Sequence, residues 1–375
     1  MTVAPQQDLE RPLPLVDLHA LHAELGDELE VAIARVWRSA RFIGGEEVEA
    51  FEEEFARYLG VRHAVGVANG TDALELALRA AGVGPGDEVL VPANTFIATA
   101  EAVVRAGASA RFVDVDPLSG LLDLTSCREC LTATTRALIP VHLYGRMVDM
   151  DAVRAFADER ALVVIEDTAQ AHGAHRFGRR AGTVGAVGCF SFFPGKNLGA
   201  FGDAGAAVTD DDAIADRLRL LRDHGRRGRD DHEVAGVNSR LDAIQAAVLR
   251  VKLPHLDRWT DARRGVAVWY RESLDARTLD WQGGDPRSEV HHLFPILTED
   301  RDGLAAHLAS AGVSTGVHYR RTVPATTAFA GSGDHCPVAD ERARRQLSLP
   351  MHPCLSEGDV ARVASEVRRF LAAGG

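Results

Sequence analysis

The chain has 375 residues, of which 46% are hydrophobic and 26% charged, a composition typical of an ordinary globular protein in water. Its 42 basic and 54 acidic residues give a net charge of −12, which disfavours nucleic acid and anionic membranes as partners. No apolar run approaches the ~18 residues of a membrane span, and the polar segment 1–14 lacks the pattern of a secretion signal. The length predicts two domains.

The five cysteines are an odd number. Without a secretion signal, this favours reduced thiols and a cytoplasmic protein. Cys127 and Cys130 form a CxxC pair, but neither a second such pair nor a spaced histidine pair accompanies it. We therefore expect no metal or redox site there.

Helical periodicity and short apolar runs alternate through the first part of the chain. The predicted elements are helices over 15–40 and 46–58, strand 63–68, helix 73–81, strand 86–92, helix 97–106, strand 110–115, a helix from about 125, strand 137–142, helix 150–159 and strand 162–165. Repeated strand–helix alternation predicts an α/β protein with a doubly wound sheet. Ligands of such sheets lie at the carboxyl ends of the strands.

The pattern changes in the remainder of the chain. The predicted elements are a helix over 213–224, a mobile charged loop over 226–232, a long helix that opens at 238–242 and is interrupted by Pro254, strand 291–297, helix 302–311, strand 313–319 and helix 360–372. We therefore expect three parts: an N-terminal arm (1–60), a large domain (61–253), and a connecting helix with a small α+β domain (254–375).

Lys196 stands in a glycine-punctuated stretch, 188–205, that holds no other basic residue. An amine among apolar and glycine neighbours can lose its proton near neutral pH. A neutral lysine is what Schiff-base chemistry with a carbonyl requires. Ser191 offers a hydroxyl from the same segment. The stretch alone would also fit a strand, a turn and an ordinary surface lysine.

A possible anion cradle follows the strand 63–68. Gly70, Thr71 and Asp72 connect this strand to an alanine- and leucine-rich helix. Free N–H groups at a helix N-terminus and a threonine hydroxyl can hold a phosphate. The alternative is ordinary capping of the helix by Thr71 or Asp72.

Two further groups follow predicted strands. Strand 162–165 ends in Glu166 and Asp167, with Gln170 shortly beyond, and a carboxylate at this edge is costly unless it is paired. Phe96 follows strand 86–92 and could stack on a flat cofactor or belong to the core. Together with Thr71, Ser191 and Lys196, these residues match what pyridoxal 5′-phosphate (PLP) needs. Its phosphate needs hydroxyl and N–H donors, its ring a stacking face, its pyridine nitrogen a carboxylate, and its aldehyde a neutral lysine.

The chain resembles, over nearly its full length, the nucleotide-sugar aminotransferases of the aspartate-aminotransferase-like, fold-type-I PLP superfamily. The resemblance is carried, besides the Lys196 stretch, by GVANGTDAL (66–74), VPANTF (91–96), PVHLYG (140–145), IEDTAQA (165–171), GVNSRLDAIQ (236–245), GVHY (316–319) and LSLPM (347–351). It implies a large, mostly parallel sheet of seven strands with a smaller C-terminal α+β domain.

The resemblance also implies roles for the residues. Lys196 would carry PLP through a Schiff base, and Asp167 would pair with the pyridinium nitrogen. Gln170 would contact the ring hydroxyl and Phe96 would stack on the ring. The phosphate would be held by Gly70, Thr71, Asp72 through its backbone, and Ser191. Asn238 would reach the phosphate of the neighbouring subunit's cofactor, so the expected assembly is a homodimer with shared active sites.

The expected reaction is transamination, with pyridoxamine 5′-phosphate formed in turnover and glutamate or glutamine as amino donor. Relatives that carry histidine in place of Lys196 are dehydratases. The segments from His232 and Phe192 look most like members that act on dTDP-3-keto-6-deoxyhexoses in deoxyaminosugar and antibiotic pathways. Members acting at C4, or on UDP-3-keto sugars, differ only modestly there and stay open as alternatives.

Candidate substrate contacts are Arg240, His318 and Tyr319. Arg320 and Arg321 follow where many relatives carry proline, which puts the shape of this loop in doubt. Two other classes are disfavoured. A DNA-binding regulator of this fold would need a basic helix-turn-helix segment, and a Rossmann dehydrogenase would need a Gly-x-Gly-x-x-Gly after the first strand.

Overall fold

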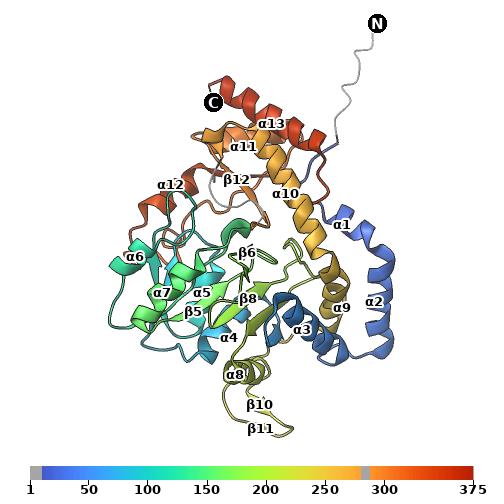
Figure 1. Ribbon diagram of the computed structural model, residues 1–375, viewed down its shortest axis with the longest axis vertical. Coiled ribbons are helices and arrows are strands. Elements are labelled where there is room, and N and C mark those ends of the chain that lie inside the picture. Colours follow the sequence, from blue (N-terminus) through green and yellow to red (C-terminus); the bar gives the residue numbers. More distant parts are fainter. Residues whose placement is uncertain (1–10, 280–287, 375) are drawn as a thin grey trace.

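The computed structural model describes residues 11–279 and 288–374 (Figure 1). Most of segment 1–14, which we interpreted as lacking a secretion signal, lies outside the described residues. No helix in the described ranges is both long and apolar enough to cross a membrane. The division into three parts at residues 60 and 253 stays a prediction.

Seven strands of the described chain form one sheet in the order β1-β9-β8-β5-β4-β2-β3. The strands are β1 (His63–Val67), β2 (Glu88–Pro92), β3 (Ser109–Val113), β4 (Thr135–Leu138), β5 (Val163–Asp167), β8 (Val187–Ser191) and β9 (Gly205–Thr209). Only β9 is reversed, because it pairs antiparallel with both β1 and β8. The predicted α/β fold with a large, mostly parallel sheet is therefore confirmed.

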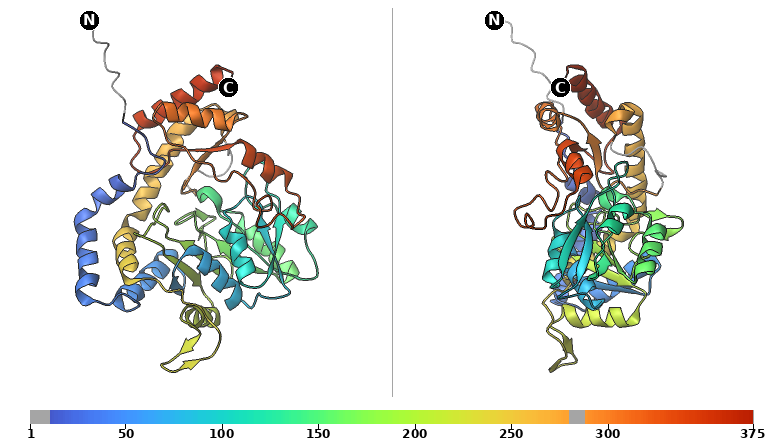
Figure 2. Two further views of the ribbon diagram at one scale, coloured as in Figure 1. Left: turned by 180° about the vertical axis from the view of Figure 1, so that it is seen from behind. Right: turned by 90° about the vertical axis from the view of Figure 1, so that its left-hand side faces the viewer.

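Helices flank this sheet on both sides in the side view of Figure 2. They are α4 (Gly70–Ala80), α5 (Ala98–Arg105), α6 (Leu124–Glu129), α7 (Met150–Arg160) and α8 (Asp212–Arg222). The strands are covered on both faces, so side chains such as Val65, Leu90 and Ile165 are fully buried. Because six of the seven strands run the same way, their carboxyl ends meet at one edge.

The N-terminal arm consists of α1 (Leu18–Glu24), α2 (Gly26–Ser39) and α3 (Glu46–Leu59), with α2 and α3 packed on α9 (Ala243–Lys252). Phe55 of α3 contacts Phe190 and Phe192 edge-on, with ring centroids 5.0 and 5.3 Å apart. Phe51 lies 5.4 Å from Phe192. These rings fix the segment that leads to Lys196 against the arm.

The long helix begins later than predicted. Residues 238–242 are irregular, Asp242 is the N-cap of α9, and Pro254 lies in the short 3-10 turn η2 (Leu253–His255) before α10 (Leu256–Ser273). The predicted interruption at Pro254 is confirmed. The predicted opening at Asn238 is wrong, because Asn238 pairs with Asp223 in a single β-bridge instead.

The C-terminal part holds an antiparallel pair, β12 (Phe294–Leu297) and β13 (Gln346–Leu349), covered by α10, α11 (Arg301–Ser310) and α13 (Glu357–Ala372). The helix α12 (Pro337–Arg345) precedes β13. The predicted strand 313–319 is wrong. Val313 and Gly316 make only isolated bridges, because the chain leaves the pairing at Gly316 and brings the next residues to a cavity.

The charged segment 226–232, predicted to be a mobile loop, contains a small hairpin. Its strands are β10 (Arg226–Arg227) and β11 (Asp231–His232), and it projects from the body of the protein below α8 (Figure 1). The imidazole of His232 lies 2.9 Å from the carbonyl oxygen of His224.

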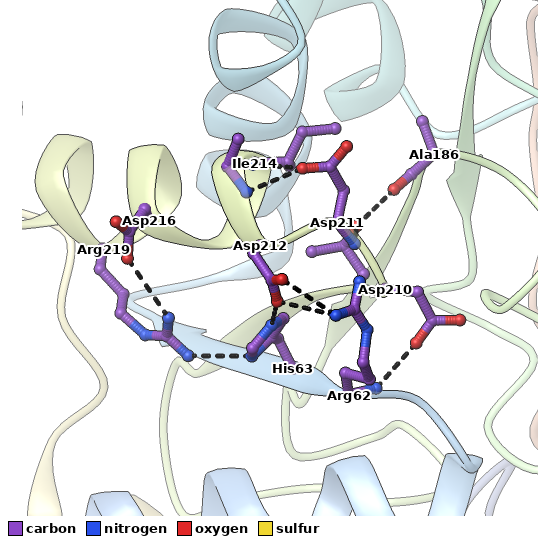
Figure 3. Close-up of polar contacts among 11 residues, drawn as sticks. Arg62, His63, Ala186, Asp210, Asp211, Asp212, Ile214, Asp216 and Arg219 are labelled. Atoms are coloured by element: carbon purple, nitrogen blue, oxygen red, sulfur yellow. Dashed lines mark hydrogen bonds and ion pairs between the residues drawn. The ribbon is translucent and has the colours of Figure 1, made fainter.

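An acidic cluster at the start of α8 ties this helix to β1 (Figure 3). Asp211 caps the helix by accepting from Ile214 N at 3.0 Å. Asp212 pairs with Arg62 at 3.0 Å and lies 2.7 Å from His63 Nε2. These partners give the cluster a structural role at the opposite end of β1 from Gly70.

Candidate functional site

A cavity of about 440 Å³ opens at the carboxyl ends of the parallel strands. Its wall includes nine of the residues selected from the sequence, which are Gly70, Thr71, Phe96, Asp167, Gln170, Ser191, Lys196, His318 and Tyr319. These residues follow β1, β2, β5 and β8 or lie at their ends, except for two that lie between α11 and α12. The carboxyl ends of the parallel strands therefore bring most of the predicted site residues together.

Lys196 lies on the loop after β8, where its backbone N–H donates to the carbonyl oxygen of Phe193 at 2.8 Å. Burial lowers the pKa of its amine to about 8, and the negative charge of Asp167 opposes part of this effect. About half of these amines are neutral at pH 8, whereas an ordinary lysine there is neutral in only ~0.3% of molecules. The amine is thus prepared to react with a carbonyl.

Asp167 is the last residue of β5 and is buried. Its Oδ2 accepts a hydrogen bond of 2.8 Å from Thr99 Oγ1, and its Oδ1 accepts one of 3.1 Å from Ala169 N. The two donors fix the plane of the carboxylate and leave acceptor capacity for a further donor in the cavity. A protonated ring nitrogen is such a donor.

Gln170 is held at both ends of its amide. Its Oε1 accepts from Tyr144 N at 2.7 Å, and its Nε2 donates to the hydroxyl of Tyr319 at 3.1 Å. Tyr144 itself has a left-handed backbone, with a φ of 63°. Gln170 is consequently fixed on the cavity wall near the end of β5.

Phe96 is 52% exposed although it lines the cavity, so the alternative that it belongs to the core is wrong. Its ring centroid lies 5.6 Å from that of Tyr319, at an interplanar angle of 39°. The ring is available to a flat ligand from the same wall as Tyr319.

The N-terminus of α4 has a cap other than the two considered in the sequence. Asn69 Oδ1 accepts from Asp72 N at 2.8 Å, so the hydroxyl of Thr71 is not used for capping. Gly70 is required because a Cβ there would lie 2.6 Å from Ser191 Cβ. Gly70, Thr71 and Ser191 together form a small cradle of N–H and hydroxyl groups, which fits a phosphate.

Asp72 does not line the cavity. Its backbone N–H is used by Asn69, and its carboxylate accepts from Arg105 at 3.0 Å on the other side of the helix turn. The resemblance implied that Asp72 holds the phosphate through its backbone N–H. The structure shows that its N–H serves the cap instead.

Asn238 and Arg240 also lie outside the cavity of their own chain. Asn238 is exposed, and Arg240 Nη1 donates to Asp223 Oδ1 at 3.0 Å. Arg320 likewise pairs with Asp302 and Arg321 is exposed. The role of Asn238 toward a second subunit stays a prediction.

His318 and Tyr319 reach the cavity because the chain turns after Gly316. The His318 ring is held by a contact of 3.0 Å between its Nδ1 and Ser348 Oγ. Burial, followed by the charge of Lys196, lowers the pKa of His318 to about 4, so the ring is neutral. The carbonyl oxygen of His318 accepts from the hydroxyl of Tyr144 at 2.8 Å.

Sequence reasoning missed several residues of the site, notably Asn69, Thr99, Asn197 and His292. Thr99 stands one helical turn after Thr95, which lies 2.9 Å from it, but no sequence pattern indicates that it meets Asp167. Asn69 has the residue type of a helix N-cap, and this signal could have identified it. The position of His292 depends on the packing of the C-terminal part against the large sheet.

Comparisons with known proteins agree with this geometry. The model of the DegT/DnrJ/EryC1/StrS aminotransferase family matches residues 24–368. The chain is 46% identical, over 96% of each chain, to a dTDP-3-amino-3,4,6-trideoxy-α-D-glucose transaminase of Streptomyces venezuelae. It is also 46% identical to a UDP-N-acetyl-3-dehydro-α-D-glucosamine 3-aminotransferase of Acidithiobacillus ferrooxidans, over 96% of this chain and 98% of that protein.

Among solved structures, the crystal structure of DesV of S. venezuelae in complex with a ketimine intermediate superposes with a TM-score of 0.93. The two chains are 46% identical, and the match covers 96% of this chain and 98% of DesV.

Proposed function

Because the chain belongs to the DegT/DnrJ/EryC1/StrS aminotransferase family, we propose that it is a PLP-dependent aminotransferase that aminates a nucleotide-linked 3-ketosugar. One observation carries the proposal. Lys196, with its lowered pKa, and Asp167, with its fixed carboxylate, line the same cavity. The two groups serve opposite ends of one ring in this chemistry.

The residues present fit the cofactor. Gly70, Thr71 and Ser191 would hold the phosphate, and Phe96 would cover one face of the ring. Gln170 would contact the ring hydroxyl. When bound, PLP supplies an electron sink at the carbon that loses its proton. The chain's own groups then position the substrates and handle the protons.

Lys196 is the residue that moves protons. Its neutral amine would take a proton from Cα of the amino-acid donor, glutamate or glutamine, and pass it to C4′ of the cofactor; in the sugar half of the cycle it would move a proton the opposite way, to the sugar carbon that receives the amine. A pKa of about 8 suits both tasks, because the amine can accept and release a proton near neutral pH. The cycle is ping-pong, with the keto acid leaving before the ketosugar binds.

The favoured sugar substrate is a dTDP-3-keto-6-deoxyhexose, as in deoxyaminosugar pathways for antibiotics. The Streptomyces transaminase supports dTDP and C3, since its name places the amine there. The A. ferrooxidans relative has the same sequence identity to this chain, 46%, and its name gives a UDP sugar as its substrate. UDP-3-keto sugars are therefore the second candidate. His318 and Tyr319 are the proposed substrate contacts, because both line the cavity.

We further propose a homodimer in which Asn238 reaches the cofactor phosphate of the other subunit, and Arg240 lies on the same loop. The exposure of Asn238 outside its own cavity supports this. The five cysteines are all unpaired, which supports a cytoplasmic location.

The test is to give the PLP-loaded enzyme glutamate together with dTDP-3-keto, dTDP-4-keto or UDP-3-keto sugars and to identify the aminated product by mass spectrometry. We expect amination of the dTDP-3-keto-6-deoxyhexose. If glutamate changes the absorbance of the bound PLP but none of the three sugars is aminated, the assignment of a ketosugar as substrate is wrong. Unchanged turnover in Lys196→Ala would remove the aminotransferase proposal itself.

A further inference from the structure

Three histidines surround Lys196, and one of them, His292, has no role in the site described so far. His292 lines the cavity beside Lys196 and His318, whereas His172 is fully buried behind the Lys196 loop, against the rings of Phe190 and Phe192. Burial, followed by the charge of Lys196, lowers the pKa of His292 far below the usual value. The ring is therefore neutral, with one donor nitrogen and one acceptor nitrogen.

The neighbouring amide decides which nitrogen carries the hydrogen. Asn197 Nδ2 donates to the carbonyl oxygen of Val290 at 2.9 Å, which fixes the orientation of the amide. Its Oδ1 therefore faces His292 Nδ1, at 3.2 Å. Because a carbonyl oxygen only accepts, Nδ1 must carry the hydrogen, and Nε2 is left as an acceptor. No hydrogen bond to Nε2 is found among the described residues.

The chemistry of an acceptor restricts what His292 can bind. Phosphate and carboxylate oxygens are acceptors themselves and gain nothing from Nε2, whereas N–H and O–H groups can donate to it. A sugar hydroxyl is a suitable donor. Since His292 adjoins Lys196, the hydroxyl must lie near the carbon that is aminated.

We propose that His292 Nε2 accepts a hydrogen bond from a sugar hydroxyl on a carbon adjacent to the one that receives the amine, and so selects among sugars. This inference rests on the proposed function. It concerns the sugar half of the cycle, in which a hydroxyl is present, and not the amino-acid half.

Two substitutions separate this role from a structural one. In His292→Asn, the side-chain amide lies near the position that Nδ1 occupies, toward Asn197. This variant has no polar atom at the position of Nε2. His292→Gln is longer and offers an oxygen near the place of Nε2. His335→Asn, at an exposed position outside the cavity wall, is the matched control.

The experiment measures equilibrium binding to the pyridoxamine-form enzyme by calorimetry. The probes are dTDP-6-deoxyglucose and its 2-deoxy and 4-deoxy counterparts, which lack a ketone and cannot react. We expect the native enzyme to bind the first probe about tenfold more tightly than one deoxy counterpart, as one hydrogen bond provides. His292→Asn should bind all three alike, His292→Gln should restore the difference, and His335→Asn should keep it.

Several results would overturn the inference. The first is a native enzyme that binds the three probes with equal affinity. The second is a His292→Asn enzyme that still binds them with different affinities. The third is an equal loss of affinity for all three probes in His292→Asn together with altered cofactor absorbance, which would indicate a structural role. If the native enzyme aminates the sugar but shows one of these results, only the role of His292 fails. If it binds no sugar nucleotide at all, the proposed function fails together with this inference.

Discussion

The hydroxyl of Thr99, at the start of α5, donates a hydrogen bond of 2.8 Å to Oδ2 of Asp167, at the end of β5. The two residues are 68 positions apart, and both are buried. A buried carboxylate needs such donors to keep its charge and orientation. Thr99 is thus a positioning residue for the carboxylate that we assign to the ring nitrogen.

Replacing Thr99 by valine should weaken the binding of PLP about tenfold, because valine keeps the shape of threonine but removes a hydrogen bond to a charged group. The dissociation constant is measured by titrating apoenzyme with PLP and following the absorbance of the bound form. Thr95→Val is the control, since Thr95 contacts Thr99 but not Asp167. Equal affinities for the Thr99→Val and native enzymes would show that the carboxylate does not depend on this hydroxyl.

Lys196 and Lys252 are the only lysines of the sequence, and burial lowers the pKa of each to about 8. Their surroundings differ. Lys252 does not line the cavity and donates to the carbonyl oxygen of Gly199 at 2.7 Å. Reduction of the PLP-loaded enzyme with borohydride should therefore attach the cofactor to Lys196 alone. Peptide mapping by mass spectrometry checks this, and an adduct on Lys252 would contradict the site.

The pH dependence of cofactor attachment follows from the lysine pKa. Attack on the aldehyde needs the neutral amine, so the attachment rate should rise with pH and level off above about 8, not near the usual 10.5. Asp167 raises the pKa of Lys196, so Asp167→Asn should move the midpoint to lower pH. Stopped-flow mixing of apoenzyme with PLP across this range gives both midpoints. A midpoint that moves upward in Asp167→Asn would contradict the assigned effect of the Asp167 charge on Lys196.

The sequence was sufficient to predict the parts of the site that follow strands. Lys196, Asp167 and Phe96 each stand after a strongly apolar run, and parallel strands bring such positions to one edge regardless of the details of packing. The helix around Pro254 was predictable for a similar reason, because proline acts locally.

Other features depend on contacts between distant segments. Thr99 and His292 acquire their roles only when α5, β5 and the C-terminal part are packed together. The segment 313–319 alternates like a strand, but it pairs with Ser348 only at Gly316. The backbone N–H of Asp72, which the resemblance assigned to the phosphate, donates to the side chain of Asn69, and a phosphate role for Asp72 stays a prediction.

The shared active site can be tested with mixed dimers. Asn238 is exposed and lies outside the cavity of its own chain, so we expect it to complete the site of a second subunit. Asn238→Ala should lower PLP affinity about tenfold or more, as loss of a hydrogen bond to a phosphate does. Lys196→Ala should be inactive. If the two variants are mixed, a heterodimer holds one site with both Lys196 and Asn238 intact.

Half of randomly mixed dimers are heterodimers, so activity at limiting PLP should recover to roughly a quarter of the native value for a two-fold symmetric pair. Differently tagged chains and native mass spectrometry confirm that heterodimers have formed. If they have formed and activity does not recover, Asn238 serves its own subunit or none. In that case the exposure of Asn238 has another cause.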